Sequence, residues 1–191
     1  MNPFQLFRDW YEAELKRTQV SIPSACCLST IGVDSYPNAR FVSLKEVTDE
    51  SFIIMGPLNS RKGVEIERSN KVALSFWWTE TEKQVRIQGD ATKIATELAD
   101  QYFSERNRDS KLVSLVSNQG QFIENLDLLE EKFRSLEVET SGRRLKRPND
   151  WGGFSIKPLR IEFLAFVQTR FHDRKLFQRT DNGWTINQVQ P

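Results

Sequence analysis

One stretch, residues 40–63, decides the fold, and it reads Arg-Phe-Val-Ser-Leu-Lys-Glu-Val-Thr-Asp-Glu-Ser-Phe-Ile-Ile-Met-Gly-Pro-Leu-Asn-Ser-Arg-Lys-Gly. Residues 40–45 are rich in apolar and β-branched side chains, residues 48–51 have turn chemistry, and residues 52–55 form a second short apolar run. This pattern predicts a β-hairpin. The apolar run at 25–31 is followed by a turn, so we expect it to add a third, antiparallel strand.

Cations gather where a helix should begin after the hairpin. Asn59 or Ser60 can cap a helix whose first residues are Arg61 and Lys62. Free backbone N–H groups and the positive end of the helix dipole lie at the same place. We therefore expect an anion there, most simply a phosphate.

Two further cations lie on the first strand of the hairpin. Arg40 and Lys45 have opposite parity and lie about 17 Å apart on an extended strand, so they should serve two different anionic groups. The alternative is that these side chains are solvated surface charges. A second set of polar residues favours a binding site over solvated charges. Strand periodicity puts Arg170, His172 and Arg174 on one face, and His172 is the only histidine of the chain.

Length and composition restrict the class of protein. With 191 residues and no visible boundary or repeat, the chain should form one domain over residues 1–191. Its 27 basic and 26 acidic residues nearly cancel, so no overall field draws it to nucleic acid or to a membrane surface. The N-terminus lacks a signal-peptide pattern, and no stretch has the roughly eighteen apolar residues of a membrane span. We expect a soluble, cytoplasmic protein.

Several chemistries lack the residues that they need. Cys26 and Cys27 are adjacent in a strand-like run, which is not the spacing of a metal site or a disulfide, so buried free thiols are expected. A single histidine argues against a multi-histidine metal site, and no dinucleotide, phosphate-loop or nucleophile-elbow motif is present. The basic run at 141–150 has no interleaved aromatic residue, which favours a solvated loop. Chemistry carried by a cofactor remains.

Periodicity predicts the other elements of a mainly β, α+β protein. Helical spacing of apolar residues predicts an N-terminal helix at 2–18, a helix at 61–69 and a helical insertion at about 96–140. In that insertion Leu126, Leu129, Phe133 and Leu136 are assigned to core packing. Strands are expected at 72–78, 84–94 with a possible bulge at Gly89, and in a C-terminal group over 154–189 comprising 154–157, 160–170, 172–179 and 184–189.

Three donors recur at helical spacing inside the insertion. A helix that continued through Tyr102, Arg106 and Ser110 would put a phenol, a guanidinium and a hydroxyl on one face. Such a face suits a phosphate. The alternative is that Tyr102 is a core aromatic and that the other two side chains are solvated.

Together these motifs resemble the pyridoxamine 5'-phosphate oxidase family over nearly the whole chain. The resemblance rests on Arg40-Phe-Val-Ser-Leu-Lys45, Ser60-Arg-Lys-Gly63, Gln84-Val-Arg86, Tyr102-Phe-x-x-Arg106 with Ser110, Arg147-Pro-x-x-Trp151-Gly-Gly, Ile161-Glu-Phe163 and Arg170-x-His-Asp-Arg174. It implies an antiparallel split β-barrel with flanking helices, and a homodimer that binds FMN at its interface. The 13 Phe and 5 Trp residues fit such an interface.

The resemblance also implies roles for particular residues. Arg40, Arg61 and Lys62 would hold the FMN phosphate, and Gln84, Gln119 and Arg174 would contact the flavin ring. The backbone beside the ring would come from Phe41, Val42, Ser43, Leu44 and Lys45. The substrate phosphate would be held by Lys45, Tyr102, Arg106 and Ser110. Arg170 and His172 would cover the pyridine ring and hold the catalytic positions, and no metal is implied.

The implied reaction is oxidation of pyridoxamine or pyridoxine 5'-phosphate by O2, which yields pyridoxal 5'-phosphate and H2O2. Some positions depart from the family pattern: Met55-Gly56 stands for Tyr-Thr, Gly120 for Ser, Leu164 for Trp, and Gln188-Val-Gln-Pro191 for Arg-Leu-x-Pro. These departures keep two alternatives open. One is a related FMN oxidase of another ring substrate, as in phenazine synthesis, and the other is a non-catalytic protein that binds FMN or pyridoxal phosphate.

Overall fold

The computed structural model describes residues 1–191 and contains one eight-stranded sheet with five helices. In chain order the elements are α1 (Pro3–Leu15), β1 (Ala25–Ile31), β2 (Pro37–Val47), β3 (Phe52–Pro57), α2 (Arg61–Arg68), β4 (Lys71–Trp78), β5 (Lys83–Lys93), α3 (Thr96–Glu105), α4 (Arg108–Val116), α5 (Leu126–Glu139), β6 (Trp151–Ala165), β7 (Asp173–Thr180) and β8 (Gly183–Gln188). The strand order is β3-β2-β1-β4-β5-β6-β7-β8, and pairing of β3 with β6 closes six antiparallel strands into a barrel. The predicted mainly β, split-barrel fold is confirmed.

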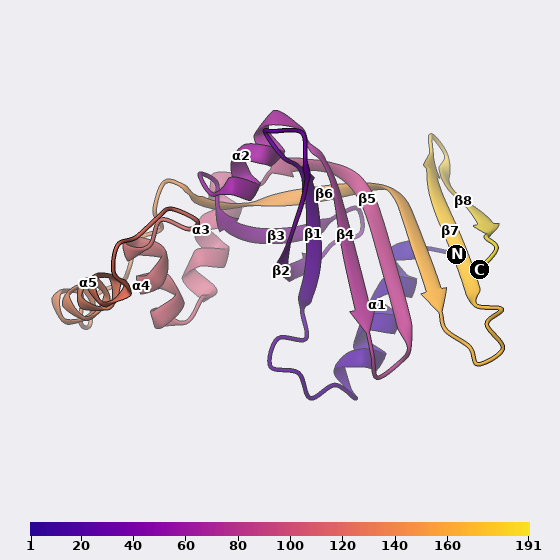
Figure 1. Ribbon diagram of the computed structural model, residues 1–191, viewed down its shortest axis with the longest axis horizontal. Helices are drawn as coiled ribbons and strands as arrows, with labels where there is room; N and C mark the ends of the chain where they lie inside the picture. Colours follow the sequence, from indigo (N-terminus) through magenta and orange to yellow (C-terminus); the bar gives the residue numbers. More distant parts are fainter. The chain divides into compact units, whose positions relative to one another are not determined.

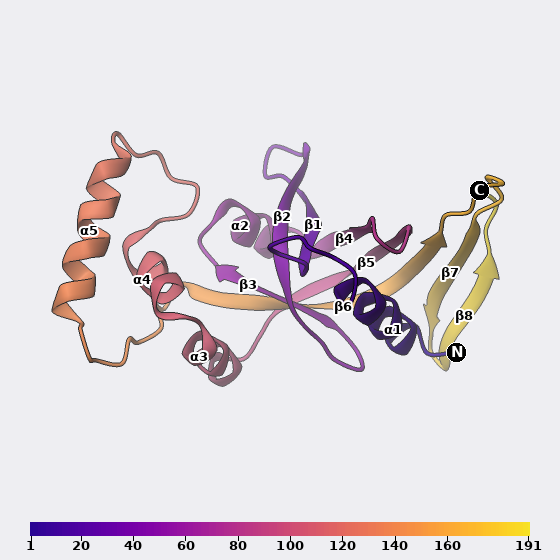
Figure 2. The ribbon, with the colours of Figure 1, turned by 90° about the horizontal axis from the view of Figure 1, so that it is seen from below.

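The chain forms two compact units. The first comprises residues 1–55, 65–92 and 154–191 and carries α1 and most of the sheet, including β7 and β8. The second comprises residues 56–64 and 93–153 and carries α3, α4 and α5 (Figure 2).

Helix α1 covers the apolar face of the sheet in the first unit (Figure 1). Phe7 is fully buried, and its ring meets Phe52, Phe76 and Trp78 edge-on at centroid distances of 4.9, 5.0 and 5.4 Å. Such edge-to-face contacts stabilise a core beyond the area that they bury. The predicted N-terminal helix is therefore present, and it explains part of the high aromatic content.

The hairpin of β2 and β3 contains a bulge at Lys45. Leu44 pairs with Ile54 and Glu46 pairs with Ile53, so Lys45 is the extra residue. A bulge turns a side chain away from the regular alternation of its strand and is common beside functional sites. The possible bulge at Gly89 does not occur in the pairing of β5 with β4, where Gly89 pairs with Val72 in an unbroken register.

The C-terminal strands differ from the prediction. β6 is one strand that ends at Ala165, whereas two strands over 154–157 and 160–170 were expected. Residues 166–172 form a turn-containing segment without strand structure, and Arg170 has a left-handed φ of 67°. The expectation that Arg170, His172 and Arg174 share one strand face is therefore wrong, because a turn interrupts the alternation.

A second helix begins near Asp109, as expected, so no continuous helix puts Tyr102, Arg106 and Ser110 on one face. α3 ends at Glu105, and Arg106 has the extended backbone angle ψ 149°. Asn107 then caps α4, since its side chain accepts a hydrogen bond of 2.8 Å from the backbone N–H of Ser110. The side-chain cap competes with continuation of the helix.

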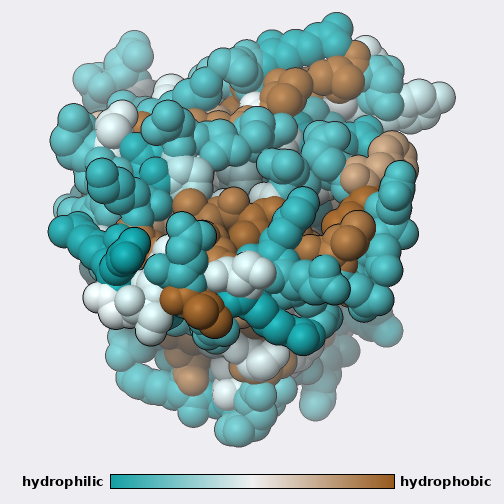
Figure 3. Space-filling view, turned by 90° about the vertical axis from the view of Figure 1, so that its left-hand side faces the viewer, coloured by the Kyte–Doolittle hydropathy of each residue, from teal (hydrophilic) through white to brown (hydrophobic).

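Helix α5 lies beside α4 but has no buried residue, so the predicted core packing of its leucines is wrong. Of the four residues assigned to core packing, Leu126 is 61% exposed, and Leu129, Phe133 and Leu136 are half-buried. Figure 3 shows the side of the molecule on which these helices lie, where hydrophobic side chains are visible among polar ones. A cavity of about 320 Å³ between α4 and α5 is lined by Val113, Val116, Leu129, Glu130, Phe133 and Arg134.

Candidate functional site

At the start of α2, the structure brings together three predicted cofactor residues, Arg61, Lys62 and Gln119. Lys62 is buried at 8% exposure, and its ammonium donates hydrogen bonds to Gln119 Oε1 at 2.5 Å and to Ser60 Oγ at 2.9 Å. Arg61 is exposed in the same first turn. A buried ammonium beside an exposed guanidinium and a helix N-terminus is suited to a doubly charged phosphate.

Glycines give this segment its tight backbone. A side chain at Gly63 would collide with the carbonyl of Leu58, which explains the glycine of the Ser-Arg-Lys-Gly motif. A Cβ at Gly56 would lie 3.0 Å from the ammonium of Lys62, so glycine at this departure from the family pattern leaves room for the cation. Gly120 has a φ of 85°, a backbone conformation that glycine adopts without strain.

Arg40 belongs to a buried ion-pair network in the first unit. Its guanidinium donates to Glu65 Oε2 at 2.7 Å and to Thr30 Oγ1 at 2.5 Å. Asn38 donates to the other oxygen of Glu65 at 2.9 Å, and the Glu65 side chain has no exposed surface. Because a guanidinium has five N–H donors, these contacts leave Arg40 capacity for a further anion. Glu65 was not predicted as part of the site, because the sequence shows it only as an acidic residue between Val64 and Ile66.

In the second unit, Arg106 and Ser110 come together although the helix breaks between them. Arg106 Nη2 donates to the backbone carbonyl of Ser110 at 3.1 Å, and the guanidinium lies 4.9 Å from the ring centre of Trp151. Arg106 Nε is buried without a hydrogen-bond partner, and burial lowers the pKa of Arg106. Tyr102 is buried at 4% exposure. A desolvated cation with an orphaned donor is suited to an anionic ligand.

His172 is oriented by the segment after β6. Its Nδ1 accepts a hydrogen bond of 3.1 Å from the backbone N–H of Val167, which places the proton of a neutral imidazole on Nε2. The centre of the imidazole ring lies 4.9 Å from that of Phe166, and the centre of the Phe166 ring lies 4.9 Å from that of Trp77. Trp77 pairs across the sheet with Gln84, a predicted flavin contact. Neither aromatic ring was singled out from the sequence, because both read as ordinary strand residues.

The remaining predicted residues lie on strands and on the turn before β7. Arg174 is half-buried and forms an ion pair with Glu162, while Leu164 pairs with Arg174 across β6 and β7. Lys45 is exposed at the bulge, and Arg170 is exposed in its left-handed turn, where its N–H donates to the carbonyl of Val167 at 3.1 Å. Residues in such strained conformations are enriched at functional sites.

The other predictions have simpler outcomes. Cys26 and Cys27 are both free thiols, as expected, but only Cys26 is buried, since Cys27 is half-buried. The basic run at 141–150 lies outside helices and strands, although Arg147 is half-buried and bonds to Asp100 and to the carbonyl of Trp151. None of the helices has the length and apolar character needed to cross a membrane.

The barrel and its phosphate-suited donors define an FMN-binding split-barrel protein, and FMN is its cofactor. The chain belongs to the pyridoxamine 5'-phosphate oxidase family, an oxidoreductase family. The family description "Pyridoxamine 5'-phosphate oxidase" matches residues 13–138, and "Pyridoxine 5'-phosphate oxidase C-terminal dimerisation region" matches residues 151–191.

Relatives of known name or structure agree with this membership. The pyridoxine/pyridoxamine 5'-phosphate oxidases of Nostoc punctiforme and Leptospira biflexa are each 38% identical and align with 100% of this chain and 89% of their own length. Among solved structures, PhzG from Burkholderia lata 383, in complex with tetrahydrophenazine-1-carboxylic acid, has a TM-score of 0.93 at 26% identity, covering 100% of this chain and 93% of that one. An FMN-binding protein of Nostoc punctiforme has a TM-score of 0.79 at 15% identity, which shows the shared fold, and covers 97% of each chain.

Proposed function

We propose that the protein oxidises pyridoxamine 5'-phosphate or pyridoxine 5'-phosphate with O2, giving pyridoxal 5'-phosphate and H2O2. Bound FMN would supply the acceptor for the hydride from C4' of the substrate and would be reoxidised by O2. The oxidised amine is an imine, which water hydrolyses to the aldehyde with release of ammonia, whereas the alcohol gives the aldehyde directly. The chain's own residues bind and orient the reactants.

One observation carries the substrate assignment: the buried Nε of Arg106 has no partner within the protein. A buried donor without an acceptor is costly, so a ligand acceptor at this place is favoured. Arg106, Ser110 and Tyr102 supply the charge and the hydroxyls that a phosphate monoester needs, and Lys45 supplies a further cation. The full-length relatives named for this activity support the same choice.

The cofactor phosphate is assigned to different residues. Arg40, Arg61 and Lys62 would hold it, and Glu65 keeps Arg40 in place through their 2.7 Å ion pair. The buried ammonium of Lys62 adds charge where little water competes. Two separate phosphate clamps would fix the two rings face to face, and such alignment can contribute several kcal/mol to catalysis.

Arg170 and His172 would cover the substrate ring. With Nδ1 occupied by the N–H of Val167, His172 presents Nε2 as a donor to an acceptor on the substrate. An orienting role therefore suits His172 better than that of a strong acid. Gln84, Gln119 and Arg174 are assigned to the polar edge of the flavin ring, since all three can donate hydrogen bonds.

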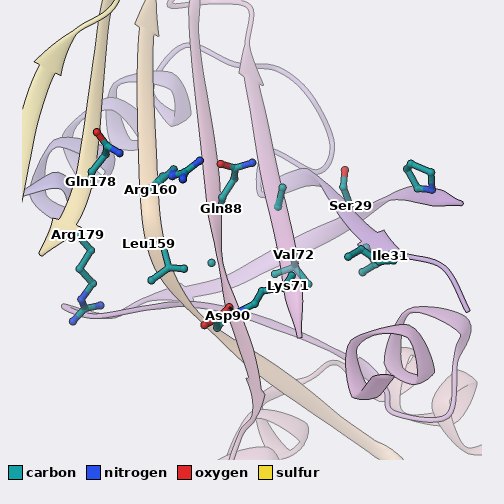
Figure 4. A pocket seen from close by; sticks show the side chains of 14 residues that line it. Ser29, Ile31, Lys71, Val72, Gln88, Asp90, Leu159, Arg160, Gln178 and Arg179 are labelled. Carbon is teal, nitrogen blue, oxygen red and sulfur yellow. Dashed lines mark hydrogen bonds and ion pairs between the residues drawn. The ribbon is translucent and has the colours of Figure 1, made fainter. Parts of the chain in front are cut away.

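The protein is expected to act as a homodimer. A hollow of about 560 Å³ on the outer face of the sheet spans strands β1, β4, β5, β6 and β7 (Figure 4). Leu159, Arg160, Gln178 and Arg179 line it and lie within the matched dimerisation region. A second copy of the chain is therefore the occupant that we assign to this face. Sedimentation should give a dimer with one FMN per subunit, and a monomer that keeps stoichiometric FMN would contradict this assignment.

A second candidate substrate is a reduced phenazine carboxylate. The likeness to PhzG over the whole chain favours it. Its carboxylate could meet the same cations, but it offers fewer acceptor oxygens than a phosphate.

A substrate panel separates these candidates. Purified holoprotein would be given pyridoxamine 5'-phosphate, pyridoxine 5'-phosphate, unphosphorylated pyridoxamine and a dihydrophenazine carboxylate, with aldehyde and H2O2 measured. We expect oxidation of the phosphorylated B6 compounds, and a loss of at least about 30-fold in kcat/KM without the phosphate. Oxidation of the phenazine compound alone would establish the second candidate, and no oxidation of any compound by FMN-loaded protein would favour a binding protein.

A further inference from the structure

Three motifs meet in one charge cluster on the outer face of the sheet. Arg174 on β7 donates from Nε and Nη2 to the two oxygens of Glu162 on β6, at 3.0 and 3.2 Å. Arg86 on β5 donates to Oε1 of the same carboxylate at 3.4 Å. The Glu162 side chain is only 13% exposed. Neither Glu162 nor Arg86 has a role in the function proposed above.

The cluster lies between two functional regions of this face. Side chains two residues apart on a strand point to the same side, so Gln84 lies next to Arg86 along β5. In the other direction the next row is Gln88, Arg160 and Gln178, which lie side by side along the hollow in Figure 4. Glu162 therefore stands between the predicted flavin contacts and the face assigned to the partner subunit.

The carboxylate fixes the direction of the Arg174 guanidinium. A two-point bond to Nε and Nη2 occupies one edge of the planar group, and this geometry restrains its rotation. Arg174 Nη1 also donates to the carbonyl of Gln190 at 3.4 Å. Two of the five guanidinium hydrogens remain for a further acceptor.

We propose that Glu162 is a positioning residue that holds Arg174 toward the flavin ring and, together with Arg86, sets the charge beside that ring. The proposal rests on the assignment of Arg174 as a flavin contact. The two cations and one carboxylate carry a net charge of +1. Reduction adds negative charge to the flavin, so a more positive cluster favours the reduced form and a less positive one favours the oxidised form.

Conservative variants separate orientation from charge. Glu162→Gln removes both the two-point bond and the negative charge, so FMN should bind about 10-fold more weakly. The midpoint potential of the bound flavin should rise. A 10-fold change in the ratio of the affinities for oxidised and reduced FMN corresponds to about 30 mV for a two-electron reduction. Glu162→Asp keeps the charge on a shorter side chain, so the potential should stay near that of the wild type. The readouts are titration of apoprotein with FMN and redox titration of the flavin spectrum.

A matched control is Asp49→Asn. It removes the acid from an arginine–carboxylate ion pair of the same unit that lies outside the cluster, Arg8–Asp49 at 2.7 Å. We expect unchanged affinity and potential for this control. Equal effects of Asp49→Asn and Glu162→Gln, or an unchanged affinity and potential in Glu162→Gln, would overturn the proposal.

Arg86→Met keeps the test decisive if Glu162→Gln does not fold. Arg86 is half exposed, and its removal leaves the bond between Glu162 and Arg174 intact. The proposal predicts nearly unchanged FMN affinity with a lowered potential, and an unchanged or raised potential would overturn it. These readouts need no substrate, so failure of the wild type to oxidise B6 phosphates would refute the proposed function and leave this inference standing.

Discussion

The substitution Arg106→Ala tests the substrate-phosphate site. It removes a guanidinium that lies over Trp151 and donates to Ser110. In a partly buried site, a charge-assisted contact with phosphate is worth about 2 kcal/mol, so KM for pyridoxamine 5'-phosphate should rise about 30-fold. Because the phosphate is remote from C4', some of the loss should also appear in kcat.

The effect on folding should be smaller than the effect on substrate. Loss of the cation–π contact and of the hydrogen bonds to Ser110 and Ser114 costs about 1 to 2 kcal/mol. Removal of the buried, unpartnered Nε offsets part of this cost. We therefore expect a folded variant with an unchanged flavin spectrum and an unchanged affinity for FMN.

Arg108→Ala is the matched control for this experiment. Arg108 lies two residues further on, and its guanidinium donates to the carbonyl of Thr140 at 2.6 Å and to that of Arg143 at 3.1 Å. This variant should lose stability without a change in KM. Steady-state kinetics and FMN titration of both variants measure the difference. If Arg106→Ala lost FMN but kept its KM, the two phosphate assignments would have to be exchanged, and if neither changed, Arg106 binds no ligand.

Three further substitutions or conditions test other parts of the structure. Arg40→Ala removes the guanidinium that forms an ion pair with the buried carboxylate of Glu65, so the free energy of unfolding should fall by about 3 to 5 kcal/mol and FMN should bind more weakly; denaturant unfolding that matches the wild type would refute this. Burial raises the pKa of Cys26 to about 12, so its thiolate forms at lower pH in the unfolded chain, and the free energy of unfolding should fall as pH rises from about 9 to 12. Mass spectrometry should find Cys26 resistant to alkylation in native protein at pH 8, and rapid labelling would contradict its burial. Gly63→Ala forces a side chain against the carbonyl of Leu58 and should cost both stability and FMN, as thermal unfolding and flavin content would reveal.

Much of the barrel could be predicted from local pattern. The run at 25–31 is the strand β1 with the same bounds, and its buried residues alternate with half-buried ones. Apolar alternation and turn chemistry act over a few residues, so a single sequence reveals them. The hairpin of β2 and β3 was predictable for the same reason, but its bulge was not, since a bulge depends on how two strands pair.

The failures arise where local pattern competes with turns, caps and burial. The strand-like alternation of side chains in the sequence continues through residues 166–172, although the chain turns there and Arg170 adopts a left-handed conformation. A new helix near Asp109 was predictable, with Asn107 as its cap, but the i, i+4 spacing of Tyr102, Arg106 and Ser110 also suggested a shared helix face that the break between α3 and α4 removes. Glu65 and Glu162 read as ordinary polar residues, because the cations that they bind are distant in sequence.

The most direct test of the proposed oxidase is an anaerobic titration of purified, FMN-loaded protein with pyridoxamine 5'-phosphate, followed in the visible spectrum. The proposal predicts that the absorbance of oxidised flavin disappears with one equivalent of substrate per site, and that admission of O2 restores it with release of H2O2 and pyridoxal 5'-phosphate. A flavin spectrum that stays oxidised in the presence of bound pyridoxamine 5'-phosphate would contradict the proposed function.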